Sequence, residues 1–168
     1  MKIREESQED FKNIHELVKV AFQTAKVSNG KEQDFVDELR ASKEKYLPEL
    51  ALVVEKDGKI IGHIMMTRMF ISDGNDRFEV LFVGPVSVLL EKRNQGVGTA
   101  LMRESLDRAR KMGFKGAFLV GDPGYYHRFG FRNSSDFNVT HAHEIPGKYV
   151  MALELFPGAL KDIRGIMN

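Results

Sequence analysis

Three segments of the chain carry apolar residues at the spacing of an α-helix. The first segment follows Ser7 and Asp10, a pair that resembles a capping box at a helix start. The third covers residues 96–112, and Gly113 is suited to end it as a C-cap. The apolar positions of the first two segments are Phe11, Ile14, Val18 and Ala21/Phe22 in one and Phe35, Val36 and Leu39 in the other. The pattern predicts a helix of about four turns, a shorter helix that ends before Pro48, and a long amphipathic helix.

Between the second and third helices the apolar pattern is typical of β-strands. After a short opening strand at Ile3-Arg4, strands are predicted at residues 50–54, 60–71 and 78–90. Asp57-Gly58 is a hairpin turn signal, and residues 73–76 form the next turn. Gly84-Pro85 interrupts the last of these strands. Because proline cannot donate to a strand ladder, we expect a bulge or a splay there.

The remainder of the chain is predicted to add short elements. Residues 117–120 form a buried strand, residues 123–129 a short helix or turn, and strands lie near residues 137–140 and 149–155. The order is therefore strand, two helices, three antiparallel strands, helix, strand, helix and two strands. This order indicates an α+β or mixed α/β fold without internal repeats.

Composition narrows the classes of function. A length of 168 residues is that of a single domain, residues 1–168, and 25 basic against 24 acidic residues give a net charge of +1. Such a balance provides no net positive potential that would attract nucleic acid or an anionic membrane surface. No stretch approaches the ~20 apolar residues that span a membrane. The absence of cysteine excludes disulfides, thiolate metal sites and a cysteine nucleophile. We expect a cytoplasmic protein.

The junction between the third long strand and the third helix contains two closely spaced glycines. Residues 93–98, Arg-Asn-Gln-Gly-Val-Gly, expose backbone amides at the positive end of a helix dipole, which suits a phosphate or pyrophosphate. A Walker loop is excluded because Thr99-Ala100 follows Gly98 without a lysine. A dinucleotide fingerprint is excluded because Leu101 stands where a small residue is needed and the surrounding strands are antiparallel. The alternative is that the glycines only permit a tight turn.

Two motifs together resemble the GCN5-related N-acetyltransferase (GNAT) superfamily. Arg93-x-x-Gly96-x-Gly98 is similar to that family's Gln/Arg-x-x-Gly-x-Gly/Ala signature, and residues 126–131, Tyr-His-Arg-Phe-Gly-Phe, resemble its Tyr-x-x-x-Gly-Phe segment. Residues 83–131 carry the likeness as recognisable sequence, and residues 121–126 with residues 151–155 resemble one bacterial branch of predicted acetyltransferases. The resemblance implies a mostly antiparallel twisted sheet of six to seven strands, splayed between the fourth and fifth and flanked by about four helices. It also implies acetyl-CoA as co-substrate.

The resemblance assigns roles to individual residues. Pantetheine would pair with main-chain groups of Val86 and Val88, the Val86 N–H would polarise the thioester carbonyl, and Tyr126 would act as the general acid that protonates the thiolate. The residues that would bind the rest of the cofactor are Arg93, Asn94, Gln95, Gly96, Val97, Gly98, Thr99 and Phe129. The family's asparagine at the end of the fifth strand is missing, because residues 120–123 read Val-Gly-Asp-Pro. Tyr126 could instead be a packed aromatic residue.

Several assignments stay open at this stage. Glu79, Asp122 and His127 are candidates for the general base by location only, and Lys92 and Arg128 for binding the 3′-phosphate. His141 and His143 would share a strand face, but without a third ligand we expect no metal. The predicted function is acetyl transfer to a primary amine of a small molecule, peptide or protein in a ternary complex, by a monomer or homodimer. The alternatives are an acyl-CoA sensor without turnover, another acyl group, or a hydroxyl acceptor.

Overall fold

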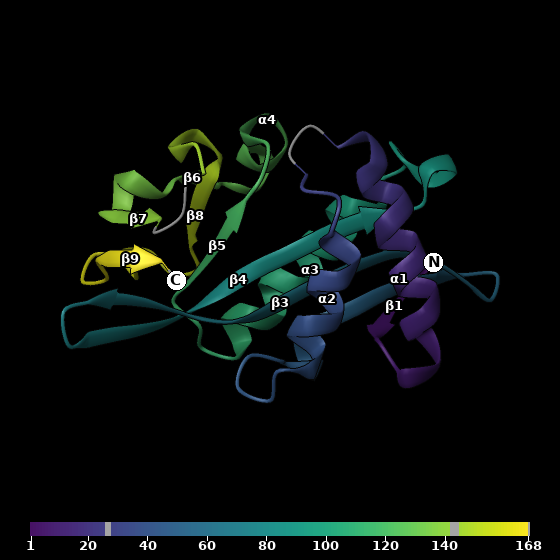
Figure 1. The fold of residues 1–168 in the computed structure, drawn as a ribbon, viewed down its shortest axis with the longest axis horizontal. Helices are drawn as coiled ribbons and strands as arrows, with labels where there is room; N and C mark the ends of the chain where they lie inside the picture. The colour runs from purple at the N-terminus through teal and green to yellow at the C-terminus, as the bar shows by residue number, and fades with distance from the viewer. Residues whose placement is uncertain (26–27, 142–144, 168) are drawn as a thin grey trace. The chain divides into compact units, whose positions relative to one another are not determined.

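The computed structural model describes residues 1–25, 28–141 and 145–167, which form two compact units (Figure 1). The first unit consists of Met1–Thr67 and Val83–Arg108, and the second of Arg68–Phe82 and Ala109–Asn168. Three elements contribute to both units: β3 (Lys59–Asp73), β4 (Asp76–Val88) and α3 (Val97–Lys111). Each unit is described by itself below.

The fold is mixed α/β, as the sequence predicts. The sheet order is β1-β2-β3-β4-β5-β8-β6, with β9 paired to β3 and β7. Pairing is mostly antiparallel, and β4 runs parallel to β5. Besides β3, β4 and α3, the described residues form seven strands and three α-helices: β1 (Lys2–Glu5), α1 (Phe11–Ala21), α2 (Glu32–Ala41), β2 (Ala51–Lys56), β5 (Gly116–Val120), α4 (Pro123–Tyr126), β6 (Arg132–Asn133), β7 (Val139–His141), β8 (Val150–Glu154) and β9 (Gly165–Met167).

In the first unit, helices cover both faces of β2 and β3. One face packs against α1 and α2, which lie in front of these strands in Figure 1, and α3 lies behind. The buried cluster on the α1 and α2 side consists of Ile14, Val18, Val36, Leu39, Ala51, Val53 and Met65. On the other face, Gly62 leaves room for α3, because an added Cβ would come within 2.8 Å of Val97 Cγ1. The apolar stripes predicted from the sequence therefore face the sheet.

Local signals in the first unit have the predicted effect. The Ser7 amide donates to the Asp10 carboxylate at 2.8 Å, so the capping box is confirmed. The predicted four-turn helix is an α-helix of 11 residues with the 3₁₀ turns Gln8–Asp10 and Phe22–Thr24 at its ends. The β2–β3 hairpin turns at Asp57 and Gly58, whose φ angles of 53° and 75° are those of a type I′ turn.

Strand β4 continues through Gly84 and Pro85. Gly84 lies so close to β3 that a Cβ would sit 2.8 Å from the Met65 carbonyl oxygen, which explains the glycine. The register between β4 and β5 joins Leu81 to Ala117 and Phe82 to Phe118, just before this glycine-proline pair. Proline is thus accommodated in the part of β4 that follows the pairs with β5.

The second unit encloses its own apolar core. Phe118 of β5, Val150 and Ala152 of β8, and Leu160 and Ile163 beyond β8 are all buried in it. Strands β6 and β9 are additions to the predicted elements, and with them the described residues form nine strands. Strand β6 has two residues and pairs with β8, and β9 has three residues and pairs with β3 and β7. These pairings define both segments as strands. Within the described ranges, no helix is long and apolar enough to cross a membrane.

Candidate functional site

The glycine loop lies in the first unit and leads directly into α3. A 3₁₀ turn, Leu90–Lys92, precedes it, and α3 begins at Val97. Gly96 has a φ of +84°, a left-handed conformation that favours glycine, and Asn94 has a φ of +61°. The first four N–H groups of an α-helix have no intrahelical acceptor, and here they belong to Gly96, Val97, Gly98 and Thr99. Gly96 is exposed, Gly98 and Thr99 are half-buried and Val97 is buried, so the loop presents backbone donors at a helix N-terminus, which suits an anion.

Arg93 holds this loop to the end of α1. Its Nη2 atom donates to the Ala21 carbonyl oxygen at 2.7 Å, and Nη1 donates to Thr24 Oγ1 at 3.2 Å. The guanidinium is thus engaged with the protein. Lys92 ends the 3₁₀ turn just before Arg93, and Val86 and Val88 lie half-buried on β4 in the same unit. The first unit therefore contains the glycine loop, Lys92 and the two predicted pantetheine residues of β4.

Tyr126 and Phe129 belong to the second unit. Tyr126 ends α4, and its ring meets Tyr125 edge-on at 4.9 Å and Phe131 at 6.0 Å between centroids. Gly121 is needed beside it, since a Cβ there would lie 2.6 Å from Tyr126 Cε2. Burial raises the pKa of the Tyr126 hydroxyl, with smaller contributions from Tyr125 and Asp122. The phenol is therefore packed as an aromatic residue and stays protonated at neutral pH.

The three candidate bases and the phosphate candidate Arg128 all lie in the second unit. Asp122 caps α4 by accepting from the Gly124 amide at 3.0 Å, and Glu79 is half exposed and pairs with Arg68 at 3.3 Å. His127 is exposed in a 3₁₀ turn. Arg128 lies over the Tyr125 ring at 4.5 Å. None of these contacts assigns a base.

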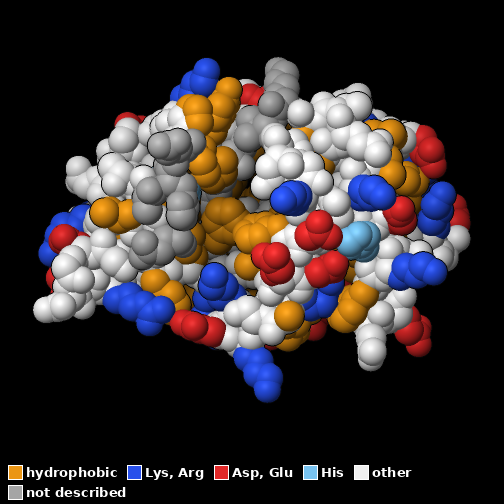
Figure 2. Space-filling view, viewed as in Figure 1, with side chains coloured by type: hydrophobic (Ala, Val, Ile, Leu, Met, Phe, Trp, Pro, Cys, Tyr) orange, Lys and Arg blue, Asp and Glu red, His pale blue; other side chains and the backbone are white. Residues whose placement is uncertain are grey.

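The predicted histidine pair is only partly described. His141 ends β7, while His143 lies outside the described residues. A different group, His15, Asp34 and Asp37, brings three potential ligand atoms within 4.8 Å of one another. It lies on α1 and α2, where acidic side chains gather in Figure 2. Asp37 already pairs with His15 at 2.9 Å and with Arg40 at 3.2 Å, so we interpret the group as an exposed ion-pair cluster.

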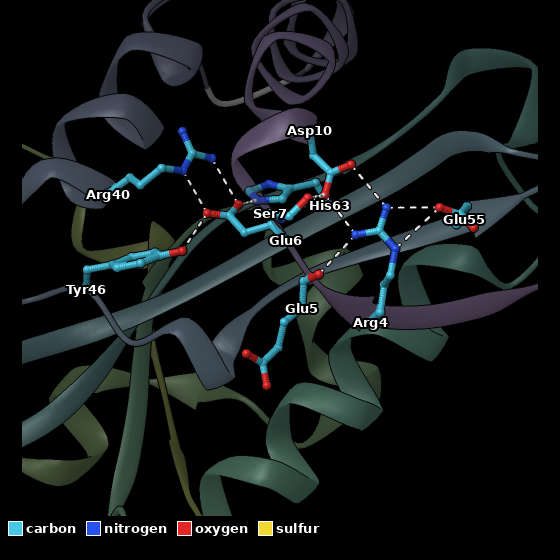
Figure 3. A network of polar contacts seen from close by, with 9 residues as sticks. All are labelled: Arg4, Glu5, Glu6, Ser7, Asp10, Arg40, Tyr46, Glu55 and His63. Atoms are coloured by element: carbon cyan, nitrogen blue, oxygen red, sulfur yellow. Dashed lines mark hydrogen bonds and ion pairs between the residues drawn. The ribbon is translucent and has the colours of Figure 1, made fainter.

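The sequence analysis missed a buried polar network in the first unit, which is centred on Glu6 (Figure 3). The Glu6 side chain is 0% exposed, and Arg40 Nε and the Tyr46 hydroxyl each donate to its Oε2 at 2.7 Å. Arg40 Nη2 and His63 Nε2 both contact Oε1 at 2.9 Å. His63 is also fully buried, on the face of β3 that α1 and α2 cover. In the sequence, the only indication of the network is that His63 is a polar residue within the apolar run of residues 60–66.

Charge and hydrogen bonds fix the ionisation of this network. Burial alone would raise the pKa of Glu6, but the hydrogen bonds from Arg40, His63 and Tyr46 outweigh it and lower the pKa from 4.5 to about 2. Burial and the Glu6 carboxylate both raise the pKa of Tyr46. Glu6 is therefore a carboxylate at every physiological pH, and it accepts hydrogen bonds from three parts of the chain.

Acid should lower the free energy of unfolding by protonating Glu6. Because its folded pKa lies below its unfolded value, the carboxylate stabilises the fold above about pH 4.5 and loses that contribution as the pH falls toward 2. The full contribution is about 3 kcal/mol at 1.36 kcal/mol per pKa unit. Urea unfolding at several acidic pH values should show this loss, and a Glu6→Gln variant should show a shallower dependence. Equal dependence in both proteins would contradict the assignment.

Comparisons with known proteins relate the chain to acetyltransferases. A family model described as an acetyltransferase (GNAT) domain matches residues 2–133. The chain is 35% identical over 101 residues to the uncharacterized N-acetyltransferase YjhQ of Escherichia coli K12, covering 60% of this chain and 55% of YjhQ. It is 32% identical over 83 residues to YhbS of the same strain, covering 49% and 48%. The matches thus span about half the length of these curated relatives.

Solved structures lead to the same family. A crystal structure of a GNAT family acetyltransferase from Brucella melitensis, in complex with acetyl-CoA, has a TM-score of 0.74 at 36% identity, over 93% of this chain and 88% of that one. The structure of E. coli YhbS in complex with CoA has a TM-score of 0.84 at 24% identity, over 99% and 87%, and supports the fold. Since the family model also matches most of its length, the chain belongs to the GNAT acetyltransferase family.

Proposed function

We propose that this chain is an acetyl-CoA-dependent N-acetyltransferase that works in the cytoplasm as a single domain, without a metal. The acetyl group goes to a primary amine of a small molecule, peptide or protein by direct attack in a ternary complex. The observation that carries the proposal is the loop of backbone amides at the start of α3, with Gly96 exposed and at a φ of +84°, in a member of the GNAT family. The acetyl-CoA bound to the Brucella relative supports the choice of donor.

The donor would be held mainly by backbone groups. The amides of residues 94–99 bind the pyrophosphate, and the hydroxyl of Thr99 adds a further donor. The main-chain groups of Val86 and Val88 pair with pantetheine as an added strand would. Because the guanidinium of Arg93 already bonds Ala21 and Thr24, its role is to hold the loop in position. Phe129 contributes apolar surface beside Tyr125.

The chemistry needs orientation, oxyanion stabilisation and two proton transfers. The amine nitrogen attacks the thioester carbon, and the Val86 N–H stabilises the oxyanion that forms. When the carbon–sulfur bond breaks, Tyr126 donates its proton to the thiolate. Burial keeps the phenol protonated for this step, and a dry site raises the pKa of the leaving thiol for the same reason.

Replacing Tyr126 with Phe should lower turnover by about 10-fold or more while acetyl-CoA binding stays nearly unchanged, because only the proton donor is lost. Steady-state kinetics and thermal shift with acetyl-CoA measure the two effects. Tyr149→Phe is the matched control, since it removes a hydroxyl from another half-buried tyrosine of the second unit. Turnover in Tyr126→Phe equal to that of the control would remove Tyr126 from the mechanism.

One pair of measurements tests the proposed function as a whole. Acetyl-CoA should raise the unfolding temperature, and a panel of primary amines should release CoA thiol. The protein contributes no thiol background because it has no cysteine. Stabilisation without thiol release would favour an acyl-CoA sensor, and release with other acyl-CoAs or with hydroxyl acceptors would redefine the reaction. If acetyl-CoA neither binds nor reacts, the proposal is wrong.

A further inference from the structure

His63 has one ring nitrogen in the Glu6 network and one without a partner. Nε2 lies 2.9 Å from Glu6 Oε1, whereas Nδ1 is buried and has no hydrogen-bond partner among the described residues. Since Glu6 is ionised and can only accept, Nε2 must carry the hydrogen of this bond. A buried nitrogen without a partner is rare in folded proteins and calls for an explanation.

The pair also has the arrangement of a carboxylate–histidine dyad. In such a dyad the carboxylate fixes the tautomer, orients the ring and stabilises the imidazolium when it forms. Here Glu6 comes from the residue after β1 and is itself held by Arg40 at the end of α2 and by Tyr46 in the following loop. Three titratable groups therefore act on His63: the Glu6 carboxylate, which contacts it, and the Arg40 guanidinium and the Tyr46 phenol, which contact Glu6.

His63 lies on β3 beside the segment of β4 that contains Val86, the proposed oxyanion donor. Gly84 lies next to Met65, and Ser87 lies next to Gly62, because an added Cβ at Gly62 would be 3.5 Å from the Ser87 carbonyl oxygen. Val86 therefore lies opposite residues 63–64 on the neighbouring strand. Adjacent strands are about 4.8 Å apart, so the proposed oxyanion donor and the strand segment that carries His63 are neighbours within the first unit.

We propose that His63 Nδ1, which is buried and has no partner in the described part of the chain, is the base that accepts the proton of the amine through one water, while Glu6 holds the ring. This role rests on the proposed acetyl transfer. The new bond joins the amine nitrogen to the acetyl carbon, the carbon–sulfur bond breaks, and sulfur takes its proton from Tyr126. His63 Nδ1 takes one proton from the ammonium group before attack and passes it to solvent, and the second proton that the nitrogen loses on forming the amide restores the Tyr126 hydroxyl through solvent. The sequence candidates Glu79, Asp122 and His127 are not needed.

The test uses His63→Gln, because a glutamine amide can replace Nε2 as the donor to Glu6 while it removes the base. The probes are Nα-acetyl-lysine amide, with an amine pKa of ~10.4, and alanyl-alanine amide, with an α-amine pKa of about 7.7–8.0. Release of CoA by wild type and variant is followed from about pH 6 to pH 10. At pH 7 the variant should lose about 100-fold in kcat/KM on the lysine probe.

The pH dependence separates a base from a structural residue. Without a base only free amine reacts, so the rate of the variant should rise about tenfold per pH unit up to the pKa of the amine. The deficit should therefore vanish at a lower pH for alanyl-alanine amide than for the lysine probe. A deficit that is constant with pH, or no deficit, would overturn the role of His63. Wild-type protein that releases no CoA with these probes or with the amine panel would instead overturn the proposed function itself.

Two further measurements exclude effects of misfolding. His15→Gln removes another imidazole of the first unit, one that pairs with Asp37 outside the Glu6 network, so it should keep the wild-type pH profile even where stability is lower. The same profile in His15→Gln as in His63→Gln would overturn the proposal. If His63→Gln does not fold, ¹⁵N NMR of the wild-type imidazole decides. The hydrogen should be on Nε2, and a hydrogen on Nδ1 alone would contradict the dyad.

Discussion

Replacing Glu6 with Gln is expected to lower the free energy of unfolding by about 3 to 5 kcal/mol. The substitution keeps the shape of the side chain but removes the buried charge that pairs with Arg40, whose side chain is only 10% exposed. Arg40 then keeps the exposed Asp37 carboxylate at 3.2 Å but loses its buried one, and a guanidinium so placed is costly. Urea denaturation measures the change. Glu16→Gln on the exposed face of α1 is the control and should stay within about 0.5 kcal/mol of wild type.

The double variant Glu6→Gln with Arg40→Met separates the cost of a buried charge from the loss of packing. Removing both partners of a buried pair is often close to neutral, so part of the stability should return. A single Glu6→Gln variant that loses less than about 1 kcal/mol would mean that Arg40 finds water or another acceptor. The network would then be a minor contributor to stability.

The second large effect is expected at the glycine loop, where Gly96→Val should reduce the affinity for acetyl-CoA by about 100-fold or more. Valine is strained at a φ of +84°, so the backbone at the start of α3 must rotate and carry its amides away from the pyrophosphate. Loss of two hydrogen bonds to a charged group costs about 3 kcal/mol or more. Isothermal titration with acetyl-CoA measures the affinity.

Gly113→Val is the matched control for strain. Gly113 follows the other end of α3, has a φ of +86°, and, like Gly96, has no atom within 4 Å of an added Cβ. Both variants should therefore lose a similar amount of stability, and only Gly96→Val should lose acetyl-CoA affinity. Equal affinities in the two variants would mean that the amides of the loop do not hold the cofactor.

Elements with local signals could be predicted from the sequence. The capping box at Ser7 and Asp10, the Asp57-Gly58 turn and the apolar stripe of α3 each act within a few residues of the chain, and each has the predicted effect. Strands β6 and β9 could not be predicted, because segments of two or three residues have no readable period. They are strands only because a distant segment pairs with them.

The same distinction applies to the candidate site. The phosphate loop is one continuous segment, so its residues and spacing are visible in the sequence. The Glu6 network joins residues that are 34, 40 and 57 positions apart, and no local pattern relates them. A buried polar residue on an apolar strand, such as His63, shows only that a partner must exist. The identity of that partner comes from the fold.

The division of β3, β4 and α3 between two units has a consequence for how the chain folds. Neither unit is a continuous stretch of sequence, since each returns to a segment that follows the other along the chain. Gly62 must meet Val97, and Lys2 must pair with Glu55, before the first unit exists. Folds that depend on such distant contacts have high contact order and close slowly. Cleavage at the β3–β4 turn would place residues 1–67 on a different fragment from α3, the helix that covers one face of their sheet.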